Sequence, residues 1–175
     1  GWKETLKKRE RPRMLVFGGE GRDGGFLHSL ERYDPSTNEW EEEAVAPMPT
    51  ARLVVGTAVL EGKLYAVGGM SEADSATSNL VERYDFATNA WEAVAPMVTP
   101  HEAHAVAVLD GKLYAVGGYN DDGGVLSSVE RYDPAEGAWE AVAPMAAERD
   151  HHAVAALDGK MYAVGGFNTD FLSSV

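Results

Sequence analysis

Short apolar runs recur along the chain, and four of them end in a pair of glycines. These runs occupy residues 14–17, 64–67, 113–116 and 161–164. A continuous apolar run of this length is typical of a strand that is covered on both faces. The glycines are Gly18, Gly19, Gly68, Gly69, Gly117, Gly118, Gly165 and Gly166, and the first glycines of successive pairs lie 50, 49 and 48 residues apart. The pattern predicts one unit of β structure that repeats about every 49 residues.

Three further landmarks follow each of the first three glycine pairs in the same order. Glu-Arg-Tyr-Asp occurs at 31–34, 82–85 and 130–133, a tryptophan comes next, and Ala-Pro-Met closes the unit at 46–48, 95–97 and 143–145. The aromatic residues of these landmarks are Tyr33, Tyr84, Tyr132, Trp40, Trp91 and Trp139. Self-similarity of this kind indicates a repeat architecture, in which each unit packs on its neighbours.

Each unit is predicted to contain four short strands, which we name A to D in chain order. Strand A ends at a turn such as Asp110-Gly111, which suits a two-residue β-hairpin. Strand B is the apolar run before the glycines, strand C carries Glu-Arg-Tyr-Asp, and strand D opens at the tryptophan. Four antiparallel strands in a unit of this size predict one blade of a β-propeller.

The predicted fold is therefore all-β, a propeller segment of about three and a half four-stranded antiparallel blades. The repeat units cover about 14–49, 50–98, 99–146 and an incomplete 147–175, and residues 1–13 are expected to form a basic linker. The glycines are expected to allow close backbone contacts and unusual φ and ψ values. The tyrosines and tryptophans are expected to fill the space between successive sheets.

Charge and composition narrow the classes of partner. The formal net charge is −13, and because residues 1–13 contribute +4 (six basic and two acidic side chains), the remainder carries −17. Such a body repels phosphate backbones, so we expect no nucleic-acid binding and a basic or neutral protein or peptide instead.

No apolar stretch reaches the roughly 20 residues that cross a bilayer, which predicts no membrane partner. The absence of cysteine fits a reducing compartment, and we expect a cytoplasmic location.

The order and spacing of these motifs over residues 14–175 resemble those of the kelch repeat family, in particular the kelch domain of the BTB–BACK–kelch proteins. The resemblance implies a propeller of five to seven blades, six in the kelch-like branch. We expect it to bind proteins and to have neither catalytic activity nor a cofactor. It also implies one specific role, substrate recognition within a ubiquitin-ligase adaptor. Two alternatives stay open: a kelch-type enzyme acting on a sugar or other small molecule, and a partial propeller that associates with itself.

In the kelch-like family, partners contact the loops between strands B and C and those between strands D and A. Carried over to this sequence, the resemblance implies a binding face formed by Arg22, Arg52, Leu53, Val54, Glu102, Tyr119, Asn120, Arg149, Asp150, His151, Phe167 and Asn168. These loops differ in length and chemistry between repeats whose strands are near copies, as is typical of a recognition surface. Acidic residues such as Asp121 and Asp122 lie among them, which favours a basic segment as ligand.

Histidines are the main candidates for other chemistry. His104 and His152 hold equivalent positions beside the expected channel, where packing is the alternative to a metal or catalytic role. His151 and His152 are adjacent on an expected strand and face opposite sides, so they cannot bind one metal together. The absence of cysteine excludes the family's copper oxidases, which need a cysteine–tyrosine cross-link. We predict no catalytic and no metal site.

Open sheet edges suggest self-association. The first unit has strands B, C and D but no strand A before Met14, and the last unit stops within strand C. In a pair of chains, strand A of one copy (about 151–157) is expected to complete the first blade of the other, giving six blades and leaving strands B and C of the last unit unused.

Overall fold

The computed structural model describes residues 14–17, 22, 24–25, 30–42, 46–73 and 75–173. The predictions for the basic segment 1–13 and for Gly18 and Gly19 lie outside these residues. The described residues form strands, turns and loops, and they include no helix that could cross a membrane. The all-β prediction is confirmed.

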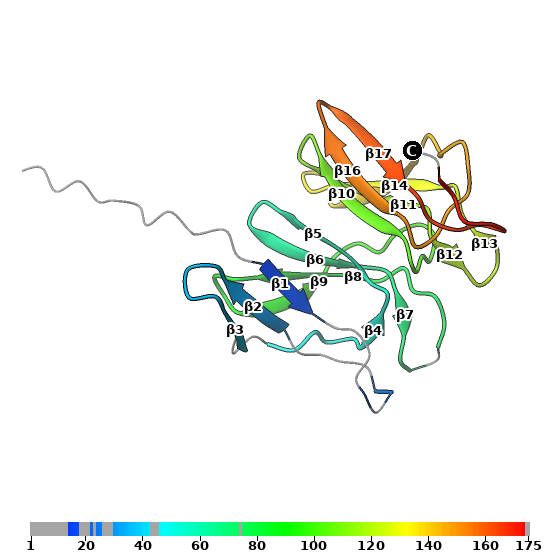
Figure 1. Cartoon of the computed structure of the whole chain (residues 1–175). Helices are drawn as coiled ribbons and strands as arrows, with labels where there is room; N and C mark the ends of the chain where they lie inside the picture. Colours follow the sequence, from blue (N-terminus) through cyan, green and yellow to red (C-terminus); the bar gives the residue numbers. More distant parts are fainter. Residues whose placement is uncertain are drawn as a thin grey trace, which may run out of the picture.

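The strands form antiparallel sheets that follow the repeats and fan out along the chain (Figure 1). Blade 1 contains β1 (Met14–Phe17), β2 (Leu30–Asp34) and β3 (Glu39–Glu42). Blade 2 contains β5 (Gly56–Leu60), β6 (Lys63–Val67), β8 (Val81–Asp85) and β9 (Ala90–Ala93). Blade 3 contains β10 (Ala105–Leu109), β11 (Lys112–Val116), β14 (Val129–Asp133) and β15 (Ala138–Val142). A final pair, the C-terminal hairpin, contains β16 (Ala153–Leu157) and β17 (Lys160–Val164).

Blades 2 and 3 have the predicted order of strands A, B, C and D, and their registers match residue for residue. Tyr65 lies opposite Arg83 in blade 2, as Tyr114 lies opposite Arg131 in blade 3. The turns between strands A and B place Glu61, Asp110 and Asp158 in the left-handed region, each followed by a glycine that is also left-handed. Paired positive φ values are those of a type I′ hairpin turn, as the Asp-Gly pattern predicted.

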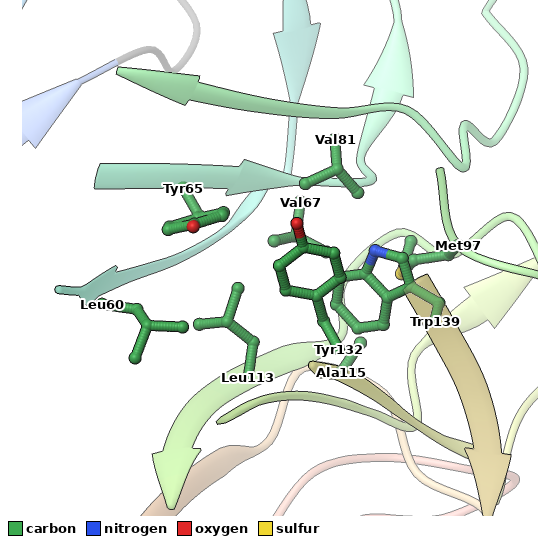
Figure 2. Close-up of a cluster of buried hydrophobic side chains, with 9 residues drawn as sticks. All are labelled: Leu60, Tyr65, Val67, Val81, Met97, Leu113, Ala115, Tyr132 and Trp139. Atoms are coloured by element: carbon green, nitrogen blue, oxygen red, sulfur yellow. The ribbon is translucent and has the colours of Figure 1, made fainter. Parts of the chain in front are cut away.

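Aromatic side chains fill the space between blades 2 and 3. Figure 2 shows Tyr132 and Trp139 of blade 3 packed against Tyr65, Val67 and other buried residues of blade 2. Within each blade the tyrosine of strand C and the tryptophan of strand D contact each other, with 5.3 Å between ring centroids in all three blades. These ring contacts join strands C and D within each blade.

Trp40 corrects the expectation that every landmark tryptophan is covered. Its side chain is 50% exposed, whereas that of Trp139 is 8% exposed. The physical reason is that Trp139 packs on a preceding blade, whereas among the described residues no sheet precedes blade 1.

The described glycine pairs have positive φ values that other residues rarely adopt. Gly117 and Gly118 have φ values of 58° and 98°. A Cβ atom on Gly117 would lie 2.5 Å from the carbonyl oxygen of Arg149, in the next repeat. A Cβ atom on Gly118 would lie 2.4 Å from the carbonyl oxygen of Glu102, in the same repeat. The first glycine therefore lets the following repeat approach, and the second lets the loop before strand A approach strand B.

Candidate functional site

The loops between strands D and A pair with the loops between strands B and C, so both predicted sets lie on one face of the fan. In blade 2 this pairing forms two short strands, β4 (Arg52–Leu53) and β7 (Met70–Ser71). In each of the next two repeats, one isolated β-bridge takes the place of these paired strands. The bridges join Glu102 to Tyr119 and Asp150 to Phe167. A further hairpin, β12 (Tyr119–Asn120) with β13 (Gly124–Val125), extends the loop of blade 3. We call this end of the fan the loop face.

Backbone hydrogen bonds join the repeats across the loop face. The amide of Ala103 donates to the carbonyl of Val54 at 3.4 Å, and the amide of His151 donates to the carbonyl of Ala103 at 2.9 Å. These three residues hold the same position in successive repeats, and all are left-handed, with φ values of 45° to 50°. Left-handed φ is costly for a β-branched residue such as Val54, so the surrounding loops must hold it there.

The predicted binding residues separate into accessible and buried groups. The exposed residues are Arg22, Val54, His151 and Phe167, and the partly exposed residues are Leu53, Glu102, Tyr119 and Asn168. The buried residues are Arg52, Asn120, Arg149 and Asp150. Apart from Arg22, the accessible residues are joined through the loop pairings and inter-repeat bonds described above.

Arg52 is a correction to the predicted contact set, because its side chain is 0% exposed. The guanidinium donates to the carbonyls of Gly68 at 2.5 Å and Leu80 at 2.8 Å. It also forms an ion pair with Glu82 at 2.8 Å. Arg149 is likewise buried and donates to the carbonyl of Gly165 at 2.7 Å. A planar guanidinium that satisfies strand carbonyls holds the loop onto the blade and has no surface left for a partner.

His101 takes the place of this arginine in blade 3. Its Nδ1 lies 2.7 Å from the carbonyl oxygen of Gly117, and its Nε2 lies 3.4 Å from a carboxylate oxygen of Glu130. Burial alone would raise the pKa of Glu130, but hydrogen bonds from His101 and from the amides of Val98 and Thr99 outweigh burial and lower it. The smaller imidazole therefore preserves the link between loop and strand C.

Asn120 and Asp150 also support the loops from inside. The Asn120 side chain donates to the carbonyl of Pro100 at 3.0 Å and accepts from the amides of Asp122 and Gly123. Asp150 lies under the loop, with one carboxylate oxygen 3.2 Å from Nδ1 of His151. Sequence position alone could not separate these supporting residues from their accessible neighbours, because their partners come from other segments of the chain.

Two contacts on the loop face were absent from the predicted residue set. The carboxylate of Asp121 accepts hydrogen bonds from the amide and hydroxyl of Thr77, which joins the loops of blades 2 and 3. Phe171 is 91% exposed, and its ring lies 5.6 Å from that of Phe167. The sequence had marked Phe171, with Tyr119 and Phe167, as a candidate aromatic anchor, whereas nothing in it marked the pair of Thr77 and Asp121.

The centre of the loop face is acidic. Burial raises the pKa of Glu102, and the nearby negative charges of Asp121 and Asp150 raise it further, while His151 acts in the opposite direction. A cation placed here would relieve the repulsion among these carboxylates.

His104 and His152 are packing residues between repeats. Burial lowers the pKa of His104 to about 3, with further lowering from the positive charges of His101, His152 and Arg52. Burial lowers the pKa of His152 to about 4. Within the part of the chain that the structure describes, no three His, Cys, Asp or Glu side chains are grouped so as to hold a metal ion.

Comparison with known proteins agrees with the repeat geometry. The model of the KLHDC2/KLHL20/DRC7 Kelch-repeats domain matches residues 5–166, most of the chain. This chain belongs to the kelch-repeat family. Its stacked four-stranded sheets with glycine pairs at the end of each strand B are thus kelch blades, and the predicted family is confirmed.

Curated relatives of this kelch chain include several kelch-like proteins. It is 37% identical over 79 residues to Kelch-like protein 40 of Xenopus tropicalis, which is 45% of this chain and 12% of that protein. It is 38% identical over 69 residues to human Kelch-like protein 23, which is 39% of this chain and 12% of that protein. The match to Kelch-like protein 22 of Rattus norvegicus is 35% over 83 residues, or 46% of this chain and 13% of that protein. The chain thus matches only about an eighth of each relative's length.

Proposed function

We propose that this kelch segment binds a protein or peptide through the loop face. The observation that carries the proposal is the contrast between blades 2 and 3: their registers coincide, while the loops at one end differ in length, pairing and chemistry. A rigid frame that presents variable, accessible loops is suited to recognition. The kelch-like relatives support a role in protein interaction.

The ligand that best fits the loop face is a basic or neutral segment with an apolar side chain. Glu102 and Asp121 supply negative charge near the partly exposed ring of Tyr119, and Phe167 adds an exposed ring. Aromatic side chains next to charges of one sign provide both buried area and orientation for a partner. Nucleic acid and anionic membrane surfaces are disfavoured by the same charges.

We further propose that the segment serves as the substrate-recognition part of a kelch-like ubiquitin-ligase adaptor in the cytoplasm. This proposal rests on the resemblance to kelch-like proteins, and detection of a ligase complex containing the full protein would test it. Catalysis on a sugar or other small molecule is the competing function. The neutral, packed state of His104 and His152 favours binding over catalysis, because neither imidazole is available as a base in a pocket.

Selection from a library of short random peptides tests the proposal. We expect selected peptides to be rich in lysine, arginine and apolar residues, and a synthetic copy of one to bind by calorimetric titration. Tyr119→Ala should weaken the binding of that peptide by about tenfold or more, because truncation of an aromatic anchor commonly costs more than 1 kcal/mol of binding free energy.

A matched control lies at the opposite ends of the strands. Glu61→Asn changes an exposed residue of the turn between β5 and β6 and keeps a residue type that tolerates positive φ. This variant should bind the peptide as the unaltered chain does. Equal losses of peptide affinity in Tyr119→Ala and Glu61→Asn, or selection of acidic peptides, would contradict the proposal.

A further inference from the structure

Two enclosed carboxylate oxygens lie in the acidic centre of the loop face. Oε2 of Glu102 and Oδ1 of Asp150 are both buried, and neither accepts a hydrogen bond from the described residues. Asp150 as a whole is only 7% exposed. Withdrawing a carboxylate oxygen from water without giving it a donor is unfavourable. The two oxygens therefore indicate a donor that comes from a ligand.

Glu102 and Asp150 hold the same position in successive repeats, where blade 2 has Leu53. The amide of His151 donates to the carbonyl of Ala103 at 2.9 Å, which brings the loops of the two carboxylates together. Since a leucine occupies the equivalent position in blade 2, the loop forms there without a carboxylate. An acidic side chain at this position is therefore not a requirement of the fold.

Asp121 adds a third carboxylate, which contacts between loops hold in place. Its Oδ2 accepts hydrogen bonds from the amide of Thr77 at 2.7 Å and from the hydroxyl of Thr77 at 2.9 Å. The backbone pairing of Glu102 with Tyr119 brings Glu102 beside the loop that carries Asp121. Burial raises the pKa of Glu102, and the charges of Asp121 and Asp150 raise it further, so the three carboxylates lie close enough to repel one another.

The protein itself offsets this repulsion only in part. Nδ1 of His151 lies 3.2 Å from Oδ1 of Asp150, and His151 lowers the pKa of Glu102. An imidazole, however, carries a positive charge only when it is protonated. The carboxylates also do not converge as metal ligands do, because no metal-binding group of three such side chains is found among the described residues. A larger cation with several N–H donors suits this arrangement better.

We propose that Glu102, Asp121 and Asp150 form a subsite for an arginine side chain of the bound protein or peptide. The inference rests on the proposed function of the loop face and specifies one side chain of the ligand. A guanidinium has five N–H donors in a plane, so it can donate to carboxylates on different sides at once. The ammonium group of a lysine donates from a single atom and fits such a set less well.

A small probe tests the subsite without any selected peptide. N-acetyl-arginine amide should give saturable changes in the backbone amide NMR signals of 102–103, 121–122 and 150–151. N-acetyl-citrulline amide has nearly the same shape but no charge. It should bind at least about tenfold more weakly, because one hydrogen bond to a charged group is worth about that factor.

Two matched variants separate the subsite from the general acidity of the chain. Glu102→Gln keeps the size of the side chain and should weaken the arginine probe by about tenfold, bringing its affinity close to that of the citrulline probe. Glu72→Gln removes the same charge from an exposed residue in the loop of blade 2, and this variant should bind the arginine probe as the unaltered chain does. Equal losses in the two variants would overturn the proposal, since they would show attraction to net charge alone.

The outcomes distinguish this inference from the proposed function. If a selected peptide binds and Tyr119→Ala weakens it, while the arginine and citrulline probes bind alike, the subsite is wrong and the loop face still binds proteins. If the arginine probe binds as expected and no peptide can be selected, the proposed function is contradicted and the subsite stands. Tighter binding of N-acetyl-lysine amide than of the arginine probe would overturn the assignment to arginine.

Discussion

One position before strand A carries Val55, His104 and His152 in successive repeats, and the two histidines face the preceding blade. The His104 ring lies in space left by two glycines of blade 2: its Nε2 is 2.5 Å from where a Cβ on Gly56 would be, and its Cε1 is 2.9 Å from that of Gly68. The sequence showed that His104 and His152 were equivalent. It could not show that each lies against a glycine of the preceding repeat, because that contact depends on how the blades stack.

The burial of His104 predicts a specific pH dependence. The pKa of His104 is lowered to about 3 in the folded chain, against about 6.5 for a free histidine, so the unfolded chain binds this proton first. The contribution of His104 to the free energy of unfolding is fully present above pH about 6.5. It is lost as the pH falls toward 3, at up to about 1.4 kcal/mol per pH unit. His104→Val, which copies Val55, should lessen the acid loss of unfolding free energy measured by urea titration between pH 7 and 4. The same loss in both proteins would contradict this account of the site.

At the scale of elements, the sequence predicted the strands well and their loops less well. The apolar runs, hairpin turns and aromatic landmarks recur in every unit. The runs and aromatic residues lie in the expected strands, and the turns lie between strands A and B. The pairing of β4 with β7 was not predicted, because two-residue strands have no hydrophobic alternation to reveal them. Arg52 was assigned to the surface for a related reason: Glu82 lies 30 residues further on, and only the folded blade brings the two together.

The glycine pairs provide a test at this scale. Gly118→Ala adds a Cβ that would lie 2.4 Å from a backbone carbonyl oxygen at a φ of 98°, whereas Gly111→Ala, at a φ of 71°, meets no atom within 4 Å. Gly111→Ala should cost about 1–2 kcal/mol for left-handed φ alone. Gly118→Ala should cost clearly more, because backbone must move as well. Equal losses of unfolding free energy in the two variants would show that the close approach at Gly118 is not needed.

At the scale of the whole molecule, the repeats form a frame with two different ends. One end consists of tight hairpin turns at Glu61, Asp110 and Asp158, and the other is the loop face, where segments from successive repeats are bonded together. The sequence predicted which segments lie on the loop face through its resemblance to kelch proteins. It could not divide them into supporting and accessible side chains, since burial there is set by contacts between repeats.

Hydrogen exchange with and without a library-selected peptide tests the central claim most directly, because it reports every segment of the chain at once. The account predicts that the peptide slows exchange at 52–54, 102–103, 119–125, 150–151 and 167–171, and leaves the hairpin turns at 61–62, 110–111 and 158–159 unchanged. Slowed exchange confined to those hairpin turns, or spread evenly over both ends of the strands, would contradict it.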